Sequence, residues 1–127
     1  MGNRAVITFN TNYSAPCVYI HWNGGRCSIE AFLKAAREFG IQYMGDETDK
    51  MDALAEMLDR FFFMGISVYR ELYGEADTNN GDNGVYIITQ GLLIMSRLHA
   101  IAEEEINPDK TEQIYATIMG AVWAEFG

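Results

Sequence analysis

The segment best suited to bind an anion joins an expected strand to an expected helix, at residues 21–26 (His-Trp-Asn-Gly-Gly-Arg). Gly24 and Gly25 allow backbone N–H groups to point into one concavity, and the start of the following helix adds further N–H groups and the positive end of its dipole. Arg26 can donate two parallel hydrogen bonds to phosphate oxygens. These residues indicate an anion-binding site. A plain turn also explains the glycines, because the segment matches neither GxGxxG nor GxxxxGK[ST].

A second polar segment, an Asn- and Asp-rich loop, follows Tyr69 and Tyr73. Side chains such as those of Asp82 and Asn83 suit base edges and ribose hydroxyls, and tyrosine rings offer flat faces on which a base can stack. The loop therefore predicts a nucleotide-binding surface. The structural alternative is a turn stabilised by Asn and Asp side chains.

Arg97 is a polar residue within the otherwise apolar segment 92–98. A buried arginine requires an anionic partner, which is either an internal carboxylate or the phosphate of a ligand. The chain carries nine basic and 18 acidic residues, a net charge of −9, which argues against binding duplex nucleic acid through its phosphates. Residues 1–45 hold four basic and two acidic residues. We therefore expect an anion to be bound by this first third or by isolated arginines.

Catalytic and metal-binding patterns are weak. Cys27 lies at a helix start, where a thiolate is stabilised, and His21 lies on the adjoining strand, but no third orienting group accompanies them. His99 and Glu103 have the i, i+4 spacing of metal ligands, yet a solvated acidic turn explains that segment better. We expect a protein that is not an enzyme and that has no catalytic residue, metal or cofactor.

The elements that position these residues follow the order ββααβββα. Alternating and β-branched residues predict strands at 4–9, 17–22, 66–70, 85–89 and 92–98, the first two forming a hairpin and the last two joined by a tight turn at Gln90-Gly91. Both of the last two strands are apolar enough for the middle of a sheet. Helical spacing predicts helices capped by Ser28 and ended by Gly40, opened by residues 46–49, and begun at Pro108. The fold class is α+β, a single domain over residues 1–127 with a small, mainly antiparallel sheet and packed helices.

The apolar residues of the last helix cover more than one face, so we expect that helix to be used in a homo-oligomer. No window of about 18 apolar residues exists, and we expect no membrane partner. With two cysteines and no secretory signal, the chain is expected in a cytoplasm. The acidic face formed by Asp49, Asp52, Glu56 and Asp59 leaves open an alternative, an acidic DNA mimic or anti-restriction-type inhibitor that binds a host protein.

Four segments resemble those of a known family of small phage proteins: Asn3 to Ile7, Tyr19 to Arg26 with its His-Trp-Asn-Gly-Gly-Arg stretch, Ser28 to Leu33, and Gly81 to Tyr86. On these motifs the chain resembles the phage Thoeris anti-defence sponge proteins of the first type, over most of its length. The resemblance implies a viral protein that acts in the host bacterial cytoplasm. It would bind a cyclic ADP-ribose isomer made by a TIR-domain defence protein (glycocyclic ADP-ribose) without cleaving it, and would act as a homo-oligomer.

Carried onto this sequence, the resemblance implies that Tyr73, with Tyr69 as second choice, stacks on the adenine, and that Asn83 hydrogen-bonds the base or ribose beside Asp82. It also implies that Arg97 contacts the pyrophosphate. Gly24, Gly25 and Arg26 would form an anion site, which in some family members is a separate pocket for cyclic oligonucleotides.

Overall fold

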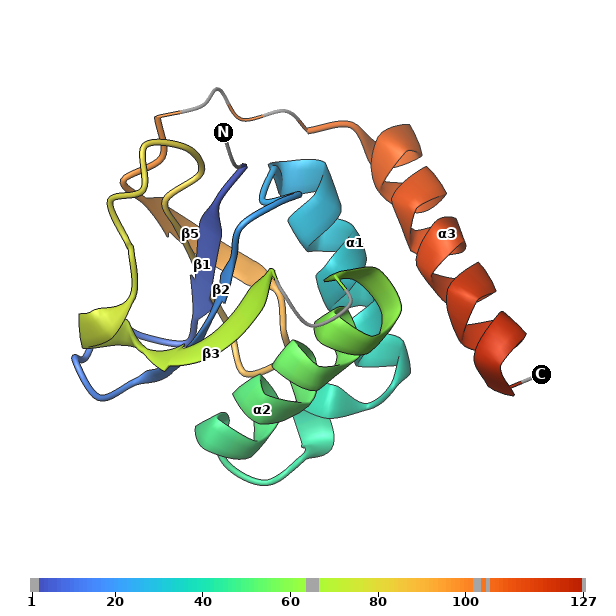
Figure 1. Ribbon diagram of the computed structural model, residues 1–127, viewed down its shortest axis with the longest axis horizontal. Coiled ribbons are helices and arrows are strands. Elements are labelled where there is room, and N and C mark those ends of the chain that lie inside the picture. The colour runs from blue at the N-terminus through green and yellow to red at the C-terminus, as the bar shows by residue number, and fades with distance from the viewer. Residues whose placement is uncertain (1–2, 64–66, 102–103, 105, 127) are drawn as a thin grey trace.

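The computed structural model describes residues 3–63, 67–101, 104 and 106–126. It combines one five-stranded sheet with three α-helices, which confirms the expected α+β architecture (Figure 1). Short 3-10 turns at Ile41–Tyr43 and Tyr73–Glu75 and a π-helical turn at Asp59–Phe63 complete the chain. The main elements are β1 (Ala5–Thr8), β2 (Pro16–Ile20), α1 (Arg26–Glu38), α2 (Glu47–Leu58), β3 (Val68–Leu72), β4 (Val85–Ile88), β5 (Ile94–Leu98) and α3 (Pro108–Phe126).

The sheet has the strand order β3-β2-β1-β4-β5. The predicted β1–β2 hairpin is confirmed, and all neighbours are antiparallel except β1 and β4, which run parallel with Val6 opposite Val85. The expectation that both final strands suit the middle of the sheet is right for β4 and wrong for β5. β5 is an edge strand on which Met95 is 63% exposed.

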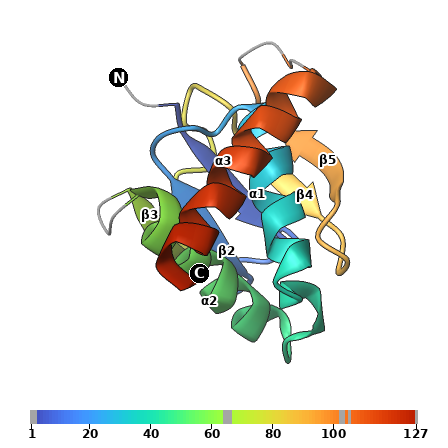
Figure 2. The same ribbon diagram turned by 90° about the vertical axis from the view of Figure 1, so that its right-hand side faces the viewer.

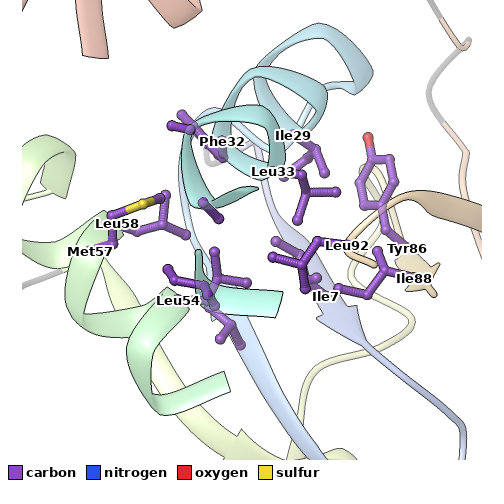
Figure 3. Close-up of a cluster of buried hydrophobic side chains, with 14 of the residues drawn as sticks. Ile7, Ile29, Phe32, Leu33, Leu54, Met57, Leu58, Tyr86, Ile88 and Leu92 are labelled. Carbon is purple, nitrogen blue, oxygen red and sulfur yellow. The ribbon is translucent and has the colours of Figure 1, made fainter. Parts of the chain in front are cut away.

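Helices cover one face of the sheet in two layers. α1 lies between the sheet and α3, while α2 packs against β2 and β3 (Figures 1 and 2). Their apolar side chains meet those of the sheet in one core, part of which Figure 3 shows. The labelled core residues include Ile7, Ile29, Phe32, Leu33, Leu54, Leu58, Tyr86, Ile88 and Leu92.

The other face of the sheet has a smaller apolar cluster. Val6, Cys17 and Val85 are fully buried there, and Tyr73 and Ala76 of the long loop after β3 pack against them. This loop, which occupies the side of the sheet away from α3 in Figure 1, places its aromatic residue on the face opposite to the helices.

Several element boundaries differ from the predictions by a few residues, among them the start of α1, the start of β3 and the β4–β5 connection. α1 begins at Arg26 after the extended residue Gly25, so Ser28 lies inside the first turn and is not the cap. β3 begins at Val68, two residues later than expected, and Ile66 lies outside the described residues. The β4–β5 connection is longer than a two-residue turn and includes Leu92 at φ +63°. Hydrophobic periodicity locates an element but not its first turn, because end residues are set by local hydrogen bonds.

The other helix boundaries are confirmed. Asp46 caps α2, since its side chain accepts from the backbone N–H of Asp49 at 2.9 Å while the Asp49 carboxylate accepts from the Asp46 N–H. Gly40 follows α1 with φ +74°, and α3 begins at Pro108. None of the helices in the described part of the chain is both long and apolar enough to cross a membrane.

α3 has apolar residues on two sides. Ile118 and Val122 are buried against the rest of the molecule, whereas Trp123 is 69% exposed. The use of this helix in a homo-oligomer stays a prediction.

Candidate functional site

A pocket of about 540 Å³ lies where the first turn of α1 meets β5, the long loop and the N-terminal half of α3. Its volume falls within the range of about 300–1,000 Å³ that is usual for small-molecule sites. Among the lining residues that the structure describes, three are basic and one is acidic, although the chain as a whole is acidic. The polar lining consists of Asn3, Asn23, Arg26, Ser28, Asn83, Arg97, Glu104, Lys110 and Thr117.

Arg97 is held by contacts on three sides. It lies opposite Tyr86 in the β4–β5 pairing, and its guanidinium carbon is 3.8 Å from the centre of the Tyr86 ring. Nη2 donates to the backbone oxygen of Asn83 at 2.7 Å, and Nη1 donates to Oε1 of Glu104 at 3.0 Å. Nε is buried and has no hydrogen-bond partner among the described residues. A buried N–H donor without a partner is unusual in a folded protein.

Arg26 approaches the same carboxylate from α1. Its Nε donates to Glu30 at 2.6 Å, one helical turn away, and its Nη1 donates to Oε1 of Glu104. The hydrogen bond from Arg26, aided by that from Arg97, holds the pKa of Glu104 below its usual value against the opposing effect of partial burial. Glu104 was expected to lie on a solvated acidic turn. It instead joins two arginines that are 71 positions apart in the sequence.

Asn83 is buried at the pocket edge and connects the long loop to the N-terminal strand. Its side-chain amide donates to Oδ1 of Asn3 and to the backbone oxygen of Arg4 at 3.2 Å. The neighbouring Asn80 is also buried: its amide donates to the oxygens of Asp77 and Gly84, and its Oδ1 accepts two backbone N–H groups. For Asn80 the structural alternative, an Asx-stabilised turn, is therefore the right interpretation.

The two glycines of the predicted anion-binding segment differ in role. Gly25 precedes α1, which has no side-chain cap, and it lines the pocket. Gly24 lies behind it, where its carbonyl accepts a hydrogen bond from the Tyr86 hydroxyl at 2.7 Å. A Cβ at Gly24 would stand 2.6 Å from the backbone oxygen of Asn3, so the close approach to β1 requires glycine there.

The structure brings together four of the predicted ligand-binding residues, Gly25, Arg26, Asn83 and Arg97, around the one pocket. It therefore places the glycine–arginine segment beside Arg97 and not in a separate pocket. The tyrosines expected to stack on the base, and the Asp82 side chain expected beside Asn83, lie elsewhere. Within one chain, Tyr69, Tyr73 and Asp82 are not part of this pocket's lining.

Strand register explains the separation. Tyr69 pairs with Tyr19, and Tyr19 pairs with Val6, whose side chain belongs to the sheet face covered by the long loop. Arg97 shares the other face with Tyr86, a member of the main core. Tyr69 lines a smaller hollow of about 220 Å³ with Tyr19 and three carboxylates.

Asp82 is engaged by an ion pair at the edge of the long loop. Its carboxylate accepts from Nε of Arg4 at 2.8 Å and from the Arg4 backbone N–H at 3.1 Å. The side-chain hydrogen bond from Arg4 lowers the pKa of Asp82 below its usual value. The residue therefore connects the loop to the N-terminal segment.

The structure also gives the positions of the residues considered for catalysis, for metal binding and for the acidic face. Cys27 lines the pocket and is 4% exposed, while His21 is outside the lining and shares a 2.9 Å hydrogen bond with the Tyr19 hydroxyl. Glu103 lies outside the described residues. No group of three or more His, Cys, Asp or Glu suited to a metal occurs within the described ranges. On the acidic face of α2, Asp52 pairs with Arg70 at 2.8 Å.

Comparison with family models, curated proteins and solved structures finds no match for the chain. Two guanidinium groups and the uncapped start of a 13-residue helix face one cavity, an arrangement that can bind a phosphorylated or carboxylated ligand. The residue that sequence reasoning missed is Glu104, and the requirement of Arg97 for an anion was the one signal that pointed to it.

Proposed function

We propose that the protein is a phage anti-defence sponge, which binds a TIR-generated cyclic ADP-ribose isomer in the host bacterial cytoplasm and withholds it from its effector. The observation that carries the proposal is the convergence of Arg26 and Arg97 on a single carboxylate in a ligand-sized pocket. The same convergence suits a pyrophosphate, because guanidinium groups match the spacing of phosphate oxygens. The motif resemblance supplies the identity of the signal.

Sequestration places physical demands on such a site. A sponge is consumed in proportion to its ligand, and nanomolar binding requires about 12 kcal/mol. The pocket favours tight binding because both arginines are held in place before the ligand arrives, Arg26 by Glu30 and Arg97 by Asn83 and Tyr86. In our proposal the ligand leaves the site intact, so the protein acts by slow release and not by turnover.

The oligomeric part of the proposal concerns the aromatic residues. Tyr69 and Tyr73 lie on the sheet face opposite to Arg97 in one chain. If Tyr69 or Tyr73 stacks on the base of a ligand bound at Arg97, that tyrosine therefore comes from a second copy of the chain. A site confined to one chain would use the arginines, Asn83 and the start of α1 alone.

The test separates binding from cleavage. Excess protein is incubated with glycocyclic and other cyclic ADP-ribose isomers, free ligand is measured by chromatography, and the protein is then denatured by heat and the ligand measured again. The proposal predicts depletion followed by recovery of the intact ligand. An altered product would instead make the protein an enzyme. Absence of depletion would refute the sponge and favour the acidic decoy, whose test is Asp52→Ala with Glu56→Ala.

A matched pair of variants ties the activity to this pocket. We expect Arg97→Ala to weaken binding by at least about thirtyfold, since it removes a charged hydrogen-bonding partner from a partly buried site. Arg70→Ala removes an equal charge from the ion pair with Asp52, outside the pocket, and should retain binding. Equal losses in both variants would mean that overall charge, and not this site, controls affinity.

A further inference from the structure

We propose that Glu104 is an internal counter-ion that a ligand bound by both Arg26 and Arg97 must displace, and that this competition lowers the affinity of the pocket for such a ligand. This inference rests on the proposed anion-binding function and adds an internal competitor for the ligand at the same site. It starts from one atom: Oε1 of Glu104 accepts from Nη1 of Arg26 and from Nη1 of Arg97. A ligand phosphate that accepts hydrogen bonds from both of these Nη1 atoms has to occupy the position of that oxygen.

The exposed fractions of the three side chains indicate which partner leaves. The Glu104 side chain is 38% exposed, whereas those of Arg26 and Arg97 are 19% and 14% exposed. Returning the carboxylate to water therefore costs less than moving either arginine, because a more exposed charge has already kept part of its hydration.

The arginines also remain in position without Glu104. Arg26 keeps its 2.6 Å contact with Glu30, and Arg97 keeps its 2.7 Å contact with the Asn83 oxygen and its place over the Tyr86 ring. Displacement thus opens two oriented Nη1 donors beside Nε of Arg97, which has no partner among the described residues. Lys110 lines the same pocket and adds a further positive charge.

Charge balance indicates which ligands can displace the carboxylate. A singly charged anion that replaces Glu104 exchanges one negative charge for another and gains little. A diphosphate brings at least two negative charges to the two guanidinium groups and can use both arginines at once. Displacement therefore lowers the affinity by the same factor for every ligand that needs both arginines, and a ligand that brings two charges compensates for it best.

The experiment compares the wild-type protein with Glu104→Gln in titration calorimetry. The probes are inorganic pyrophosphate, ADP-ribose and 3′,5′-cyclic AMP, whose phosphodiester carries a single negative charge. Glutamine keeps the shape of the side chain and removes its charge. We expect binding of pyrophosphate and ADP-ribose to tighten about tenfold, the equivalent of two partly exposed ion pairs. We expect 3′,5′-cyclic AMP to gain less than ADP-ribose, because one charge can bind one arginine without displacing Glu104.

Glu112→Gln is the matched control, since it removes one negative charge from an exposed ion pair with Lys34 outside this pocket. It should leave the affinities unchanged. Equal affinities of Glu104→Gln and wild type would overturn the inference while leaving the anion site intact, as would equal tightening by the control variant. Absence of binding to all probes in both proteins would overturn the anion site and the inference together.

A second measurement uses the wild-type protein and does not depend on the folding of a variant. The carboxyl carbon of Glu104 is followed by NMR through a pH titration, with and without saturating pyrophosphate. In the free protein the arginines lower the pKa of this carboxyl group. The inference predicts that the pKa rises toward its ordinary value when pyrophosphate is bound, because the carboxylate has left the arginines. A pKa that stays low in the bound protein would refute displacement.

Discussion

Tyr86 links the pocket to the core, and its hydroxyl group can be removed without changing the ring. The side chain is fully buried, its hydroxyl donates to the Gly24 carbonyl at 2.7 Å, and its ring lies beneath Arg97. Tyr86→Phe leaves this carbonyl without its partner. The cost is about 1–2 kcal/mol, the net value of a hydrogen bond together with part of the penalty for an unpaired buried acceptor.

The magnitude converts into a melting temperature. A chain of 127 residues unfolds with an entropy of about 0.27 kcal/mol/K near its midpoint, so the variant should melt about 4–7 °C below the wild type. Tyr13→Phe is the control, because Tyr13 is 83% exposed, and its melting temperature should not change. Calorimetry measures both.

The same variant should retain its affinity for anions, since the aromatic ring that supports Arg97 remains. A Tyr86→Phe protein as stable as the wild type would refute the assignment of a stabilising role to this hydrogen bond. A variant that lost ligand binding in proportion to its stability would show that the hydroxyl positions Arg97, contrary to our reasoning.

Four further predictions concern the fold and its assembly. Gly84→Ala should lower the free energy of unfolding by at least about 3 kcal/mol in urea titrations, because Gly84 has φ +64° and an added Cβ would lie 2.0 Å from the Leu98 oxygen. Gly120→Ala, inside α3 with nothing within 4 Å of the added Cβ, should instead stabilise the protein by about 1 kcal/mol. Burial raises the pKa of the Cys17 thiol from 9.0 to about 12. The contribution of the neutral thiol to stability is therefore complete below pH 9 and is lost as the pH rises toward 12. Denaturation at several pH values measures this loss, and a constant free energy of unfolding over that interval would contradict the prediction. Trp123→Glu should convert an oligomer into a monomer in sedimentation experiments if α3 forms the interface, and an unchanged mass would place the contact elsewhere.

The sequence predicts the elements of this fold better than it predicts which side chains meet. Periodicity locates α1 and α3 because their buried faces repeat every three or four residues. It gives no information on strand order, and the parallel pairing of β1 with β4 decides that the long loop covers the face opposite to Arg97. Residue types alone therefore grouped Tyr73 with Arg97, although the sheet separates them.

Some residues of the candidate site can be recognised from the sequence, and others cannot. Arg97 is recognisable from sequence because a cation in an apolar strand requires an anion nearby. Its partner Glu104 is not, since an acidic turn far from Arg26 in the chain has the composition of a solvated surface. The backbone contacts of Asn83 and Asn80 depend on the path of the loop, which side-chain chemistry does not specify.

The parallel pairing of β1 with β4 also has a consequence for synthesis on the ribosome. Val6 finds its partner Val85 only after about 80 further residues have been added, which takes about 4–16 s at ordinary translation rates. During that interval one edge of β1 has no partner strand. Arg26 of α1 has neither Arg97 nor Glu104 beside it. A nascent chain therefore acquires its pocket in one late step, and ribosome-bound fragments that end before residue 97 should have no capacity to bind the ligand.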